Sequence, residues 1–138
     1  MTDEEKKIVQ ASWTQVTPIA AEAADMFYNR LFALDPTLEP LFATRDMSAQ
    51  KLALVQALSL AVSGLEEPET LAPVLRALGH RHAGYGVRTA HYETVGAALL
   101  WTLEQGLGAD ATPRVLRAWA TAYALISEQM IAGAAEAA

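Results

Sequence analysis

Two of the three histidines of this chain stand two residues apart, in the stretch "LGHRHAGYGV" at residues 78–87. A His-x-His pair suggests metal binding, because imidazole is the commonest protein ligand of metal ions. On an α-helix, however, residues two apart diverge by about 200° around the axis, so His80 and His82 cannot chelate one ion together. His82 extends the apolar stripe that starts at Leu71 and Leu75, whereas His80 falls on the opposite face. His82 is therefore expected to point inward, either as a ligand or as a hydrogen-bonded core histidine.

Two further polar side chains have inward positions on other predicted helices. Gln50 precedes Leu54 by four residues, and Tyr28 follows Phe27 at the edge of an apolar stripe. Alone, each is also typical of an exposed amide or of a tyrosine at the margin of a core. The third histidine, His91, follows a glycine-containing turn and has no evident partner. Together, an imidazole, an amide and a phenol would suit a haem iron with one axial imidazole and an open face for a gas molecule.

The elements that must position these side chains are helices, because apolar residues recur at helical spacing almost throughout the chain. Pro18 suits the first turn of the second helix, whose inward stripe is expected to end at Leu34. The three tryptophans are expected to pack in the core. The predicted helices cover approximately residues 2–17, 18–34, 48–64, 71–83, 90–105 and 112–130. The sequence therefore predicts one all-α domain over residues 1–138.

The composition excludes several classes of protein. The chain has no cysteine, which excludes disulfides, thiolate–zinc sites, iron–sulfur clusters and thioether-linked haem. A net charge of −6 with only ten Lys and Arg does not favour a nucleic-acid partner. The acidic start "MTDEEKKIVQ" does not resemble a secretory leader, and no apolar run reaches the roughly 18 residues of a membrane span. We therefore expect a cytoplasmic protein that does not insert into membranes.

Several segments, in order along the chain, resemble one family. They are "FYNRLFALDP", "PLF" at residues 40–42, "LGHRHAGYGV" followed by "HYETVG", and "AWATAY". Over essentially its whole length the chain resembles the bacterial single-domain globins, close to the globin domain of flavohaemoglobins. The resemblance implies a globin fold of roughly six to eight helices around a pocket that holds haem b without a covalent link.

Carried over position by position, the resemblance assigns roles to individual residues. His82 matches the proximal iron ligand and Phe42 the phenylalanine that stacks on the haem. Tyr28 and Gln50 match the distal residues that donate hydrogen bonds to bound O₂, whereas His80 matches no functional position. The other implied haem contacts are Leu54, Val87 and Tyr92. Basic residues that could steady the haem propionates are not singled out, because exposed basic side chains are commonly just solvated; they are Arg45, Lys51, Arg81 and Arg88.

The chain departs from the flavohaemoglobin pattern at its C-terminal end. Flavohaemoglobins use a glutamate of the last helix to hydrogen-bond the proximal histidine, but eleven residues past Tyr123 this chain has Ala134. The last segment offers only Glu136. Without a carboxylate partner, strongly activated, peroxidase-like chemistry is not expected. The chain ends where the resemblance would place a flavin and nicotinamide reductase, so any turnover is expected to need an external reductase.

Three functions remain open at this point. The first is reversible and tight binding of O₂ and other diatomic gases, for storage or transport. The second is enzymatic: a nitric oxide dioxygenase that converts NO and O₂ to nitrate with a separate reductase. The third is a gas or redox sensor, or a haem-free regulatory module. The presence of both His82 and Phe42 makes the haem-free form the less favoured of these. The protein is expected to be a monomer or a weak homodimer.

Overall fold

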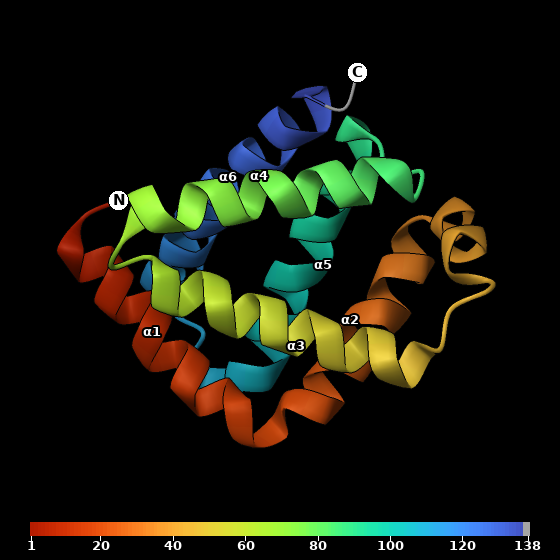
Figure 1. Ribbon diagram of the computed structural model, residues 1–138. Coiled ribbons are helices and arrows are strands. Elements are labelled where there is room, and N and C mark those ends of the chain that lie inside the picture. The colour runs from red at the N-terminus through yellow and green to blue at the C-terminus, as the bar shows by residue number, and fades with distance from the viewer. Residues whose placement is uncertain (137–138) are drawn as a thin grey trace.

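The computed structural model describes residues 1–136, and within them every regular element is a helix (Figure 1). This confirms the all-α prediction. No helix within residues 1–136 is long and apolar enough to cross a membrane. In chain order the elements are α1 (Asp3–Val16), the 3₁₀ turn η1 (Thr17–Ile19), α2 (Ala20–Leu34), the 3₁₀ segment η2 (Pro36–Phe42), α3 (Met47–Gly64), α4 (Pro68–Gly84), α5 (Thr89–Leu107), η3 (Gly108–Asp110) and α6 (Pro113–Glu136).

Side-chain caps define where three of the helices begin. At α1, the Glu5 N–H donates to Thr2 Oγ1 at 3.1 Å and the Thr2 N–H donates to Glu5 Oε1 at 2.8 Å, and together these two bonds form a capping box. Asp46 caps α3 by accepting from the Ser48 N–H at 3.0 Å. Thr112 Oγ1 caps α6 by accepting from the Val115 backbone N–H at 3.3 Å.

The second helix ends at Leu34 as predicted, but its start and the burial of its last residue differ from the prediction. Pro18 lies in the separate turn η1, and α2 begins only at Ala20, because the chain changes direction between α1 and α2. Leu34 was expected to be buried, but its side chain is 43% exposed. It is the last residue of α2, and the backbone becomes extended at Asp35, so neighbouring elements no longer cover it on all sides.

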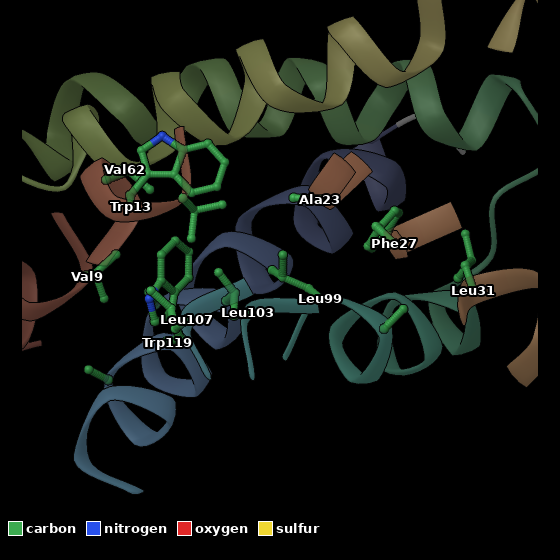
Figure 2. Packing of buried hydrophobic residues seen from close by; sticks show 14 of the residues in the cluster. Val9, Trp13, Ala23, Phe27, Leu31, Val62, Leu99, Leu103, Leu107 and Trp119 are labelled. Atoms are coloured by element: carbon green, nitrogen blue, oxygen red, sulfur yellow. The ribbon is translucent and has the colours of Figure 1, made fainter. Parts of the chain in front are cut away.

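The main core is built from α1, α2, α5 and α6, with a contribution from the end of α3 (Figure 2). The rings of Trp13 and Trp119 are 6.0 Å apart, and both indole N–H groups have partners. Trp119 Nε1 donates to Ser12 Oγ at 2.7 Å and Trp13 Nε1 donates to Ser59 Oγ at 3.1 Å. Both tryptophans therefore pack as predicted, whereas Trp101 is only half-buried.

Helix α4 packs against α6 at main-chain distance, because glycine occupies both sides of the crossing. A Cβ atom added at Gly79 of α4 would overlap the carbonyl oxygen of Met130 on α6. A Cβ at Gly133 of α6 would overlap the carbonyl oxygen of Arg76 on α4. Arg76 Nη1 also donates to Gln129 Oε1 across the same crossing, at 2.9 Å. Close helix packing of this kind fixes α4, and with it His82, relative to the core.

Candidate functional site

A cavity of about 260 Å³ lies between α3 and α4, with further walls from α2, η2, α5 and α6. In Figure 1, α3 and α4 run across the front one below the other, and α5 is seen between them. The structure places all seven sequence-predicted site residues on the wall of this cavity. They are Tyr28, Phe42, Gln50, Leu54, His82, Val87 and Tyr92. His80 is exposed and does not line it, which agrees with the helical periodicity.

His82 presents one free ring nitrogen to the cavity. Its Nδ1 lies 2.8 Å from the carbonyl oxygen of Leu78, one turn earlier on α4. A carbonyl oxygen only accepts, so Nδ1 must carry the proton and donate. The neutral ring then has its lone pair on Nε2, which is the state that a metal ligand requires. The contact with Leu78 also fixes the orientation of the ring.

His91 lines the same cavity and was missed as a candidate in the sequence. Its Nδ1 accepts a hydrogen bond from the Arg88 backbone N–H at 2.9 Å, at the start of α5. In the neutral ring, Nε2 therefore carries the proton and is a donor, with no lone pair for a metal. The two hydrogen bonds distinguish the two histidines: only His82 is held in the tautomer that can ligate through Nε2.

The electrostatic surroundings of His82 also favour the neutral ring. Burial lowers the pKa of His82, and the positive charges of Arg81 and Arg45 act in the same direction. The hydrogen bond to Leu78 offsets this lowering in part. At neutral pH the imidazole is therefore uncharged and its lone pair is available.

Tyr28 and Gln50 form the polar part of the opposite wall. Tyr28 is 5% exposed, and its ring packs edge-on against Phe27 at 5.0 Å and against Phe42 at 5.6 Å. Burial raises the pKa of the Tyr28 hydroxyl, and the neighbouring Gln50 side chain offsets part of that rise. The phenol is therefore protonated at neutral pH and can donate a hydrogen bond into the cavity. Two helices, α2 and α3, thus bring a hydroxyl and an amide to one place.

Tyr92 lines the cavity from α5 without a hydrogen-bond partner for its hydroxyl. Its main-chain oxygen is used instead, since the Tyr123 hydroxyl donates to it at 2.5 Å. Burial raises the pKa of both phenols. Among residues 1–136 no Asp or Glu lines the cavity, and Glu136 is exposed. The carboxylate that flavohaemoglobins place beside the proximal histidine has no counterpart in this wall.

Comparison with known proteins identifies the family. A sequence model of the globin family matches residues 25–130. The chain belongs to the globin family. Among curated proteins, it is 33% identical over 130 residues to a flavohaemoprotein of Rhizobium meliloti, covering 93% of this chain and 32% of that protein. A flavohaemoprotein of Bacillus subtilis is 33% identical over 107 residues, covering 76% of this chain and 27% of its own length. This globin thus spans about a third of the length of these relatives.

Solved structures agree with this assignment. An engineered carbene transferase made from a candidate nitric oxide dioxygenase of Rhodothermus marinus superposes with a TM-score of 0.88 at 25% identity, covering 99% of this chain and 94% of its own. A bacterial globin from Campylobacter jejuni superposes with a TM-score of 0.85 at 24% identity, covering 98% of this globin and 97% of its own chain. The globin fold expected from the sequence is confirmed.

Globin membership, with flavohaemoproteins among the relatives, implies a haem cofactor. The chemistry of the cavity fits that group. Its wall is mainly apolar, and it contains one imidazole with a free lone pair, His82. Elsewhere in the described chain, no three His, Asp or Glu side chains come together to hold a metal ion. An iron carried in a macrocycle needs no such cluster, because one axial imidazole is sufficient.

Proposed function

We propose that this globin binds haem b non-covalently and uses it to bind O₂ reversibly and tightly. The observation that carries the proposal is that three side chains line one cavity. His82 on α4 is in the tautomer that can bind a metal, and Tyr28 on α2 and Gln50 on α3 are hydrogen-bond donors. His82 would ligate the iron. Burial of the apolar body of the haem beside Phe42, Leu54 and Val87 would supply most of the binding energy.

When bound, haem supplies a ferrous iron that binds diatomic gases and shifts electron density onto O₂. The Tyr28 hydroxyl and the Gln50 amide can donate hydrogen bonds to a gas ligand that gains negative charge. A hydrogen bond to a charged group contributes about 1.5–3 kcal/mol, so each donor would slow the release of O₂ by about tenfold to a hundredfold. Carbon monoxide gains less charge and would be retained less by these donors.

Tyr28→Phe tests this proposal. The ring remains, so the edge-on contacts with Phe27 and Phe42 are kept and only the donor is lost. We expect the O₂ dissociation rate, measured by stopped-flow mixing, to rise about tenfold to a hundredfold. The dissociation rate of CO should change much less. Tyr92→Phe is the matched comparison, because it removes a hydroxyl from another wall of the same cavity, and it should change the O₂ rate far less than Tyr28→Phe. An O₂ dissociation rate in Tyr28→Phe equal to that of the parent would refute the distal assignment.

Nitric oxide dioxygenation is the second candidate. It is favoured by the flavohaemoprotein relatives and by the Rhodothermus marinus protein, whose description names that activity. Slow release of O₂ would suit it, because O₂ would be held until NO enters the cavity. The reaction would require a reductase to return the iron to its ferrous state. The two candidates are separated by measuring NO consumption with a supplied reductase. Catalytic consumption beyond the loss of NO by autoxidation alone would favour the dioxygenase.

A further inference from the structure

Two side chains from opposite walls meet at the edge of the haem cavity. Arg45 lies in the loop between η2 and α3, and Tyr85 is the C-terminal cap of α4. The Arg45 guanidinium carbon lies 4.1 Å from the centre of the Tyr85 ring, which is a cation–π contact. Both residues line the cavity, and neither is buried. The contact therefore joins the loop before α3 to the end of α4, the helix that carries His82.

The chain around this contact holds both partners at the edge. Gly86, directly after Tyr85, has a φ of 94°, a left-handed conformation that favours glycine and turns the chain back towards α5. A Cβ atom at Gly86 would lie 3.3 Å from Leu41 Cδ2 of η2, so the turn after α4 also touches the opposite wall. The Tyr85 ring lies 6.0 Å from the His82 ring, which places the contact close to the proposed iron ligand.

Charge makes the position of Arg45 distinctive. Among the described residues that line the cavity, Arg45 is the only Arg or Lys, and none is Asp or Glu. No carboxylate of the described residues lies within ion-pairing distance of Arg45, so the Tyr85 ring is the group that holds its guanidinium.

We propose that Tyr85 is a positioning residue that holds Arg45 across the mouth of the cavity, and that this pair slows the release of bound haem. The inference rests on the haem binding proposed above. The pair joins the two walls that must separate for a flat cofactor to leave. Because the position of Arg45 depends on its contact with Tyr85, the effects of the two side chains on haem retention should be coupled and not independent.

The test is a double-mutant cycle on the rate of haem release. Ferric haem-bound protein is mixed with an excess of a haem-free scavenging globin, and the transfer is followed by absorption. Exposed cation–π contacts are weak, so we expect Tyr85→Leu and Arg45→Gln each to release haem about two- to fivefold faster than the parent. The double variant should be no faster than either single variant. Tyr85→Phe, which keeps the aromatic face, should release haem at the parental rate.

Arg81→Gln is the matched control, because it removes a positive charge close to His82 from an exposed position outside the cavity. It should not change the rate. Additive effects of Arg45→Gln and Tyr85→Leu, or a parental rate for Tyr85→Leu, would overturn the inference while leaving haem binding intact. In the additive case Arg45 would act on the haem carboxylates without Tyr85. A parent protein that takes up no haem would overturn both this inference and the proposed function.

Discussion

Replacing His82 with glycine is expected to weaken haem binding by more than about a hundredfold. Groups that only orient a ligating histidine already contribute about 10–100-fold to metal affinity, and His82 would be the ligand itself. Its Nε2 is the free nitrogen of a ring whose Nδ1 is committed to the Leu78 carbonyl. Imidazole added to the solution should enter the space left by the side chain and restore the absorption spectrum of the parent. Titration with haemin, with and without imidazole, measures both effects.

Two other histidines supply controls for this experiment. His80→Gly removes an exposed imidazole two residues away and should bind haem like the parent. His91→Gly is the more demanding control, because His91 lines the same cavity. It should also retain the parental spectrum, since His91 Nδ1 accepts from Arg88 and leaves no lone pair on Nε2. Loss of haem from His91→Gly but not from His82→Gly would reverse the assignment of the ligand.

Gly79→Ala is expected to destabilise the protein by about 3 kcal/mol, although it adds only one methyl group. The added Cβ would overlap the Met130 carbonyl oxygen, and the obstacle is backbone that cannot rotate away. The α4–α6 crossing would have to open, and His82 follows Gly79 by three residues on α4. Haem affinity should therefore fall together with stability. Urea unfolding at equal haem occupancy measures the stability change.

Gly84→Ala is the matched control for the helix crossing. Gly84 lies in the same helix, but a Cβ atom there would meet no atom within 4 Å. Since alanine favours a helix over glycine, the variant should be as stable as the parent or more stable by up to about 1 kcal/mol. Equal stability of Gly79→Ala and the parent would show that α4 and α6 are not held at main-chain distance.

Local patterns in the sequence predicted the parts of the site that lie on regular helices. The apolar stripe of α4 separated inward His82 from outward His80, and the resemblance to bacterial globins assigned Tyr28, Gln50 and Phe42, all of which line the cavity. The same reasoning was wrong for Leu34, because periodicity does not reveal where a neighbouring element stops covering a helix.

Residues contributed by loops and helix ends could not be found in this way. Arg45, Tyr85 and His91 reach the cavity only because the tertiary fold brings the loop after η2, the end of α4 and the start of α5 to one edge. The tautomer of each histidine likewise depends on a hydrogen bond that no spacing rule specifies. The main-chain contact at Gly79 could not be predicted without knowing its partner on α6, Met130, which lies 51 residues later in the chain.

The most direct test of haem binding through His82 is the absorption spectrum of the purified protein after addition of one equivalent of haemin. We expect a sharp Soret band in the ferric form, a shift on reduction under nitrogen and a further shift on exposure to air as O₂ binds. A protein that leaves the spectrum of free haemin unchanged would contradict the central claim.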